Sequence, residues 1–240
     1  MMKILVDTHT HTILSGHAHS TLMENATIAA RKHLEGFVVA DHGPKMPLSL
    51  NEWGINILFS FPDYMEDVRV FRGAEANILD YEGNVDIPAK LGHRLEFVIA
   101  SMHDVVIDPG TVEQNTAAAL NALKKPYIDV IGHPDRTWAD MNSEEIVRGT
   151  AELGKIIEIN NHSFSDPTAV NNCRTIIQLC KKLDVRITLA SDAHIAYNVG
   201  HFPKAIAMLE EENFPEELIV NRNMQTFEEY LSTRTYRAKK

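Results

Sequence analysis

Short apolar runs recur along the chain and are separated by longer stretches of mixed polarity. The runs are rich in Val, Ile, Phe and Ala, and short continuous runs of this kind are typical of strands buried on both faces, as in parallel sheets. They occupy residues 4–6, 37–40, 68–74, 97–101, 128–132, 156–159 and 187–190. The pattern therefore predicts a set of buried strands.

Helical patterns lie between most of the predicted strands. They cover residues 22–34, 111–124, 143–153, 166–183, 203–212 and 224–231. Thr21 and Glu24 have capping-box spacing before the first of these helices. Asn142 and Glu145 give a similar start signal before the third. Strands that alternate with helices predict a parallel α/β fold, either a closed barrel or an open doubly wound sheet.

Three segments depart from this alternation. Residues 45–67 predict a long loop with a broken helix, and residues 80–88 predict a turn or hairpin around Gly83 and Asn84. The basic end, residues 234–240, is expected to fray.

Each predicted strand is followed by residue types that bind metals or take part in catalysis. In chain order these are Asp7, His9 and His11; Asp41 and His42; Glu75; His103; His133; Asn160, Asn161 and His162; Asp192 and His194. In a barrel of parallel strands all carboxyl ends open onto one face. An open sheet would bring together only the strands beside its switch point. The strand ends therefore favour the barrel.

The residue types at these strand ends predict a metal cluster. Imidazole nitrogens and carboxylate oxygens suit Zn, Fe or Mn. His9 and His11 lie two residues apart, so both rings are able to face one ion. A single strand-end histidine is equally compatible with a hydrogen-bonded loop residue. Six histidines at the ends of predicted strands are not explained as separate loop residues. They are His9, His11, His42, His103, His133 and His194.

Composition and charge narrow the range of partners. The chain has 240 residues, a length that one α/β barrel fills as a single domain, and 44% of them are hydrophobic. The formal net charge of −10 disfavours nucleic acid as a partner. A phosphate-bearing substrate would therefore need a local positive site, which bound metal ions would supply.

The N-terminus and the cysteines bear on location. The N-terminal sequence lacks the apolar run of a signal peptide, and no stretch approaches the roughly 18 apolar residues of a membrane span. We therefore predict a cytoplasmic protein with no membrane partner. Cys173 and Cys180 are expected to be buried thiols on one helical face, because seven helical residues separate them by about 10 Å, too far for a disulfide.

Several short motifs occur in an order and spacing found in one known family. They are HTHT near the N-terminus, His17, DHG at residues 41–43, RGAEAN around Glu75, His103, GHPD around His133 and SDAH at residues 191–194. Over nearly the whole chain these motifs resemble the PHP (polymerase and histidinol phosphatase) family. HAHST at 17–21, EINNHSF at 158–164 and NFP at 213–215 are similar to its small stand-alone, YcdX-like phosphatase subgroup.

The resemblance implies a single PHP domain over residues 1–240, folded as a distorted (β/α)7 TIM-like barrel around three divalent metal ions (Zn, Mn or Fe). His9, His11, Glu75 and Asp192 would hold the first ion. Glu75 would bridge to a second ion held by His103 and His133. The third ion would be held by His17, His42 and His194. All of these positions carry the expected residue types.

The resemblance also implies phosphoester hydrolysis by a metal-bound hydroxide, with Glu75, Asp192 and His194 as catalytic residues and a small phosphorylated compound as substrate. Three divalent ions would outweigh the two carboxylates, so the site would be cationic. A nuclease or phosphodiesterase, an amidohydrolase-like enzyme and a non-enzymatic metal-binding module are the alternatives. The negative net charge and the complete ligand set count against them. The sequence predicts no particular oligomeric state.

Five residues outside the ligand set are candidates for supporting roles. Arg136 is a candidate phosphate contact, because a guanidinium fork suits phosphate, although a solvent-facing loop position fits it equally. His19 and His162 are candidate substrate contacts, with surface positions as the alternative. Asp7 and Asp41 are expected to orient neighbouring histidines.

Overall fold

The computed structural model describes residues 2–234, and its centre is a ring of parallel strands. The strands are β1 (Val6–Thr10), β2 (Gly36–Val39), β4 (Val68–Asn77), β5 (Phe97–Ser101), β6 (Val130–Ile131), β7 (Ile156–Asn160) and β8 (Ile187–Ala190). Each pairs in parallel with the next in this order. A short strand, β3 (Tyr64–Met65), pairs antiparallel with β4 and lies outside the ring.

The ring closes between β1 and β8 without a continuous ladder of backbone hydrogen bonds. At the carboxyl ends, the amide of His11 donates to the carbonyl of Ala193 at 2.9 Å. Lower down, Asn221 fills the gap, and its Nδ2 donates to the carbonyls of Val6 and Leu189, each at 2.7 Å. The structure therefore confirms the predicted distorted (β/α)7 TIM-like barrel, and the distortion lies at this seam.

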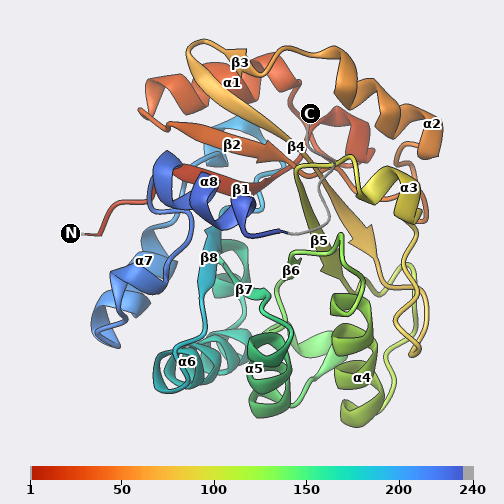
Figure 1. The fold of residues 1–240 in the computed structure, drawn as a ribbon, viewed down its shortest axis with the longest axis vertical. Helices are drawn as coiled ribbons and strands as arrows, with labels where there is room; N and C mark the ends of the chain where they lie inside the picture. Colours follow the sequence, from red (N-terminus) through yellow and green to blue (C-terminus); the bar gives the residue numbers. More distant parts are fainter. Residues whose placement is uncertain (1, 235–240) are drawn as a thin grey trace.

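Helices cover the outside of the ring. They are α1 (Leu22–Arg31), α4 (Val112–Leu123), α5 (Ser143–Glu152), α6 (Pro167–Lys182) and α7 (Pro203–Glu211), while α8 (Met224–Ser232) packs onto the core inside the barrel. In Figure 1, α4, α5 and α6 lie along one side of the barrel and α1 lies along the other. Thr21 and Glu24 form the predicted capping box of α1, and the Asn142 side chain caps α5 as expected.

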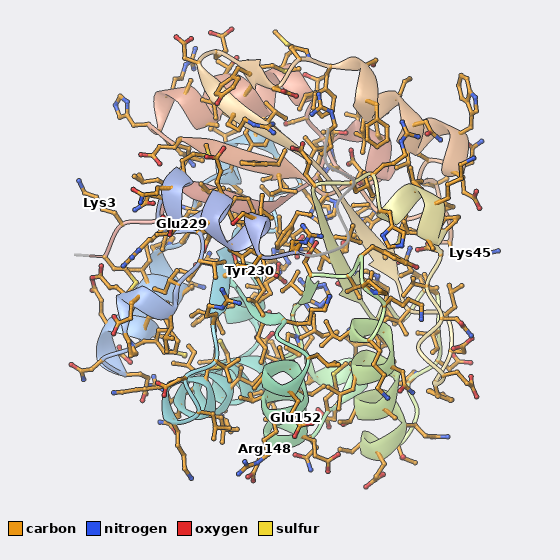
Figure 2. The ribbon with its side chains drawn as sticks, viewed as in Figure 1. Lys3, Lys45, Arg148, Glu152, Glu229 and Tyr230 are labelled. Atoms are coloured by element: carbon orange, nitrogen blue, oxygen red, sulfur yellow. The ribbon has the colours of Figure 1, made fainter. Side chains whose placement is uncertain are left out.

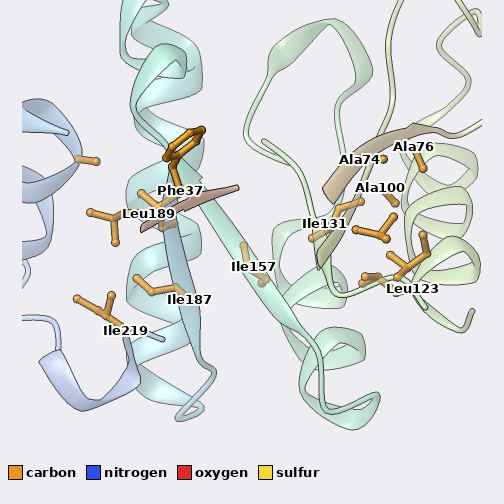
Figure 3. Packing of buried hydrophobic residues seen from close by; sticks show 14 of the residues in the cluster. Phe37, Ala74, Ala76, Ala100, Leu123, Ile131, Ile157, Ile187, Leu189 and Ile219 are labelled. Atoms are coloured by element: carbon orange, nitrogen blue, oxygen red, sulfur yellow. The ribbon is translucent and has the colours of Figure 1, made fainter. Parts of the chain in front are cut away.

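Two apolar cores hold this arrangement together. The larger core lies between the strands and the helices, and Figure 3 shows part of it, from Ile187 and Leu189 on β8 to Ala100 on β5 and Leu123 on α4. The smaller core fills the inside of the barrel. Phe227 on α8 packs edge-on against Phe71 and Phe97 there, with ring centroids 5.0 and 5.5 Å apart. Because α8 covers the inner core, the functional face is left to the carboxyl ends of the strands.

The first predicted strand is wrong in its bounds. The apolar run at residues 4–6 stops where β1 begins, and the strand instead carries the polar sequence Val6–Thr10. All five of its residues are buried, and the four polar side chains, those of Asp7 to Thr10, find hydrogen-bond partners inside the molecule. Thr8 Oγ1, for example, lies 2.8 Å from Thr188 Oγ1 across the seam. Satisfied polar groups therefore take the place of apolar ones in this strand.

The irregular segments largely follow expectation. The short helix α2 (Glu52–Ile55) lies in the region predicted as a loop with a broken helix, and a second short helix, α3 (Ala89–Gly92), follows the hairpin. In the hairpin, Gly83 has a φ of 76° and the amide of Leu79 donates to the carbonyl of Asn84 at 2.7 Å. The fraying predicted for residues 234–240 falls almost wholly outside the described residues.

Two further expectations concern the cysteines and membrane spans. Cys173 and Cys180 are free and buried on α6, as predicted. Within residues 2–234, no helix has both the length and the apolar character needed to cross a membrane.

Candidate metal centre

The side chains predicted as ligands come together at the carboxyl ends of the strands. A cavity of about 380 Å³ opens there. Among the residues that line it are His17, His42, Glu75, His103, His133, Asp192 and His194. His9 and His11 are fully buried and lie within contact distance of Glu75. All nine predicted positions are thus in or against one site.

Three members of the first predicted set, His9, His11 and Asp192, have ligand atoms close enough together to hold one ion. His11 Nε2 lies 3.0 Å from His9 Nε2 and 3.1 Å from Asp192 Oδ1. Glu75 Oε2 lies 3.3 Å from His9 Nε2 and 3.6 Å from His11 Nε2. Metal–ligand bonds of about 2.1 Å place tetrahedral ligand atoms about 3.4 Å apart. The spacing of His9, His11 and Asp192 is therefore compatible with one ion, and Glu75 Oε2 borders the two histidines.

The other oxygen of Glu75 faces the second predicted set. Its Oε1 lies 3.0 Å from His133 Nε2 and 3.3 Å from His103 Nε2. The carboxylate thus divides its two oxygens between two groups of histidines. This is the arrangement expected of a carboxylate that bridges two ions.

The third predicted set is looser than the other two. His17 Nε2 and His194 Nε2 lie 3.0 Å apart, and the ring of His42 stacks on that of His17 at 4.9 Å. His42 Nδ1, however, lies 2.7 Å from Glu75 Oε2. Neither of these two atoms makes a hydrogen bond despite being buried. A buried nitrogen and a buried carboxylate oxygen without hydrogen bonds are suited to share a cation.

The electrostatics of the site favour the protonation states that metal binding needs at Glu75 and His133. At His9 burial lowers the pKa, but Glu158, Glu75 and Asp192 together raise it well above its ordinary value. Burial would raise the pKa of Glu75, but His42, His9 and His103 together hold that pKa well below its ordinary value. Burial lowers the pKa of His133 to about 4, and Arg136 adds to this effect. Ionised carboxylates and neutral imidazoles are the metal-binding forms. The residues present therefore fit a group of divalent ions.

Two of the predicted ligands have strained backbones. His133 has a φ of 30° and Asp192 a φ of 54°, a region that side-chain-bearing residues rarely adopt. Such strain is typical of functional sites, where the surrounding structure imposes it.

Glu158 is a member of this site that the sequence analysis did not single out. It is buried on β7, its Oε1 lies 2.7 Å from His9 Nδ1, and its Oε2 accepts the amide of His133 at 2.8 Å. Because Glu158 contacts His9 through Nδ1, the other ring nitrogen, Nε2, is free to bind the first predicted ion. A charged residue within the apolar run at residues 156–159 was the available signal, because carboxylates are rarely buried without a partner.

Other neighbours orient the remaining histidines. Asn77 Oδ1 lies 2.7 Å from His103 Nδ1, and Ser15 Oγ lies 3.0 Å from His11 Nδ1. Asp41 accepts a hydrogen bond from Ser15 Oγ at 2.6 Å and so reaches His11 indirectly. Partners of this kind fix ring orientation and the ring nitrogen that carries the proton.

Asp7 has a different role from the one expected. It accepts hydrogen bonds from Ser191 Oγ at 2.5 Å and from the amide of Gly200 at 2.8 Å. Its only contact with His9 is with the backbone amide, at 3.4 Å. Asp7 therefore ties β1 to the segment after β8 and does not touch a histidine ring.

The three candidate substrate contacts differ in position. Arg136 lines the cavity, and its guanidinium lies 2.5 Å from Asp192 Oδ2. His19 is exposed and lines a separate hollow beside α1, although its amide donates to the carbonyl of His194 at 2.7 Å. His162 is exposed on the 3-10 helix Asn161–Ser165 and does not line the cavity. Only Arg136 is therefore placed to meet a substrate in the cavity.

Comparison with known sequences gives full-length relatives. No protein-family model matches the chain. A probable phosphatase from Acetivibrio thermocellus is 42% identical over 240 residues, which is 100% of both chains. A probable phosphatase from Clostridium novyi is 41% identical over 235 residues, covering 97% of this chain and 96% of the relative.

Comparison with solved structures supports the fold. A histidinol phosphate phosphatase from Lactococcus lactis, solved with zinc, L-histidinol and phosphate, gives a TM-score of 0.60 at 21% identity, covering 90% of this chain and 95% of that one. Metal-dependent tyrosine phosphatases, YwqE from Bacillus subtilis and CpsB from Streptococcus pneumoniae, are represented by a chain with a TM-score of 0.58 at 17% identity, covering 97% and 95%. A chain of archaeal ribonuclease P with mature tRNA gives 0.60 at 15% identity, covering 95% and 91%. At such identities the likeness concerns the fold alone.

Proposed function

The chain belongs to the family of bacterial proteins named probable phosphatases, and from this premise we propose that it hydrolyses small phosphate monoesters at a centre of three divalent metal ions. The observation that carries the proposal is the division of the two Glu75 oxygens between two groups of histidines. We further propose that the family falls within the PHP proteins, in their YcdX-like subgroup.

The proposed ligand sets are those that the family resemblance implies. His9, His11, Glu75 and Asp192 would hold one ion, and Glu75, His103 and His133 a second. His17 and His194 would hold the third, together with His42. Divalent ions bound there would supply positive charge for phosphoryl oxygens and would lower the pKa of water to about 7.

The catalytic roles fall to Glu75, Asp192 and His194. Glu75 and Asp192 are buried and ionised, so they would keep the ions in place while the phosphate changes its bonding. His194 Nδ1 lies 3.0 Å from the carbonyl of Asp192, which leaves its Nε2 directed toward His17. Arg136 lines the same cavity and is held by Asp192, so it would present its remaining N–H groups to a phosphoryl oxygen.

The charge of the protein supports a small substrate over nucleic acid. The formal net charge is −10, and the cavity of about 380 Å³ has Arg136 as its only lining arginine or lysine among residues 2–234. A nuclease of this fold would need a basic track for the phosphate backbone.

The proposal predicts a defined metal content. Elemental analysis of the protein purified without chelators should give close to three ions per chain, together with hydrolysis of an aryl phosphate. His17→Ala should lose one ion and most of the activity while the fold is kept, because His17 is an exposed loop residue that would bind only the third ion. His33→Asn is the matched control, since His33 is an exposed histidine with a φ of 57°, which Asn tolerates. Full activity of His17→Ala with three ions still bound would contradict the assignment.

A further inference from the structure

Four apolar residues line the same cavity as the predicted ligands. Met46, Pro47 and Leu48 belong to the loop that follows His42, and Val105 belongs to the turn that follows His103. Leu48 is 83% exposed and Val105 is 58% exposed. These two side chains therefore present apolar surface at the cavity and gain little from packing within the protein.

Hydrogen bonds fix both loops to the ligands they follow. Ser49 Oγ donates to the carbonyl of His42 at 2.6 Å, and the amide of Ser49 donates to the carbonyl of Met46 at 3.2 Å. The amides of Val106 and Ile107 donate to the carbonyl of His103 at 2.9 and 3.0 Å. The apolar surface is thus held beside the metal centre and does not depend on a mobile segment.

Leu48 is kept in an unfavourable backbone conformation. Its φ of 67° lies in the left-handed region, where a bulky residue is an outlier and Asn or Gly would suit better. The loop closes on Gly16, where an added Cβ would lie 2.5 Å from the Cβ of Leu48. Gly16 directly precedes His17. A strained, exposed leucine beside a metal centre indicates contact with a ligand, because nothing in its packing accounts for it.

Within residues 2–234, the cavity lining offers no unpaired lysine or arginine to a second anionic group on the substrate. Within the described part of the chain, Arg136 is the only Lys or Arg that lines it, and Arg136 is paired with Asp192. Asp104 lies beside Val105 in the lining and would repel another anion. Lys45 lines a neighbouring hollow, and Figure 2 shows its side chain extending away from the molecule.

We infer that the substrate is a phosphate monoester whose alcohol is apolar and uncharged, an alkyl or aryl group that packs against Leu48 and Val105. The inference rests on the proposed function and names the substrate class of that site. In the reaction, water oxygen forms the new bond to phosphorus, and the bond from phosphorus to the alcohol oxygen breaks. That oxygen keeps the electron pair and takes up the proton that water loses.

The test is a series of n-alkyl phosphates from ethyl to hexyl phosphate, assayed with the metal-loaded protein. Lengthening the chain beyond ethyl hardly changes the leaving alcohol, so the series isolates apolar contact. Each methylene that the wall covers should raise kcat/KM by about fourfold, the ratio expected for burying one CH₂ group. Glycerol phosphate, whose alcohol is polar, should be a poorer substrate than butyl phosphate.

Variants identify the residues responsible. Leu48→Asn suits the left-handed backbone and removes the apolar surface, so it should lower kcat/KM for hexyl phosphate by about fourfold or more and lower that for ethyl phosphate less. Val105→Ser should act in the same direction. Val112→Ser is the matched control, because Val112 is 40% exposed at the start of α4 and does not line the cavity.

The outcomes separate the two proposals. Turnover of every alkyl phosphate with the same kcat/KM would overturn the inference and leave the phosphatase function standing. An equal loss on ethyl and hexyl phosphate in Leu48→Asn would overturn the contact between Leu48 and the leaving group. No turnover of any phosphate by protein with its ions bound would overturn the proposed function itself.

Discussion

The buried carboxylate of Glu158 connects three parts of the candidate metal centre. It contacts the ring of His9, the amide of His133 and, at 3.0 Å, the Nδ2 of Asn160. His9 has the opposite ring nitrogen directed at Glu75 and Asp192. At the scale of single residues, the site thus depends on partners that would not themselves touch an ion.

Glu158→Gln should weaken metal binding while the fold persists. Both carboxylate oxygens face N–H groups, so the amide NH₂ of a glutamine would meet a donor and the charge that orients His9 would be lost. Loss of such a partner typically lowers metal affinity by about 10- to 100-fold.

Competition with a metal-binding dye measures this affinity, and circular dichroism checks the fold. Glu152→Gln is the control, because Glu152 is exposed at the end of α5 and lies on the outside of the molecule in Figure 2. Equal affinity in the two variants would show that Glu158 does not orient His9.

The site residues that were predicted and those that were missed differ in the pattern that they leave in the amino-acid sequence. Ligands such as His103 and His133 follow apolar runs, and the rule that parallel strands open onto one face brings them together. Glu158 lies inside an apolar run, and its role depends on which histidine its side chain contacts in the folded barrel. That contact follows from the order of the strands, in which β7 lies beside β8. Leu48 meets Gly16 only because two loops close on each other, and this contact leaves no periodic pattern.

At the scale of elements, the seam between β1 and β8 is where the barrel departs from a regular ring. Asn221 takes the place of strand pairing there, and its Oδ1 also accepts the amide of Leu189 at 3.0 Å. The seven strands of the ring were predicted because buried strands leave apolar runs, whereas the short outer strand β3 was not. The seam was not predicted because one asparagine in a loop carries no signal of which strands it joins.

Removing the Asn221 side chain should destabilise the barrel. Asn221→Ala would leave the amide of Leu189 and the carbonyls of Val6 and Leu189 buried without these partners, so the free energy of unfolding should fall by about 2–4 kcal/mol. Urea denaturation followed by fluorescence measures the change. Asn198→Ala, at an exposed position, should change stability by less than about 0.5 kcal/mol. Similar values for both variants would mean that the seam is held by other contacts.

At the scale of the whole molecule, the two ends of the barrel differ in the interactions that stabilise them. α8 covers the apolar core inside the barrel, with Phe227 between Phe71 and Phe97, and this supports the ring. The carboxyl ends of the strands carry the buried histidines and carboxylates, with Glu75 at their centre. The first end combines this apolar packing with hydrogen bonds that are satisfied within the protein, such as that from Tyr230 Oη to the carbonyl of Asp129. The second leaves Glu75 Oε2 and His42 Nδ1 buried without hydrogen bonds, so its stability should depend on ions.

Removal of the ions should therefore lower the stability of the whole protein. An ion present at 100 times its dissociation constant stabilises the folded state by about 2.7 kcal/mol. For a chain of this size each kcal/mol shifts Tm by about 2–4 °C, so chelation should lower Tm by about 5–10 °C. Scanning calorimetry with and without a chelator measures the shift, and restoring the ions should reverse it. An unchanged Tm in protein shown by elemental analysis to have lost its ions would mean that the cluster is satisfied without metal, and the centre would then be a network of histidine–carboxylate contacts.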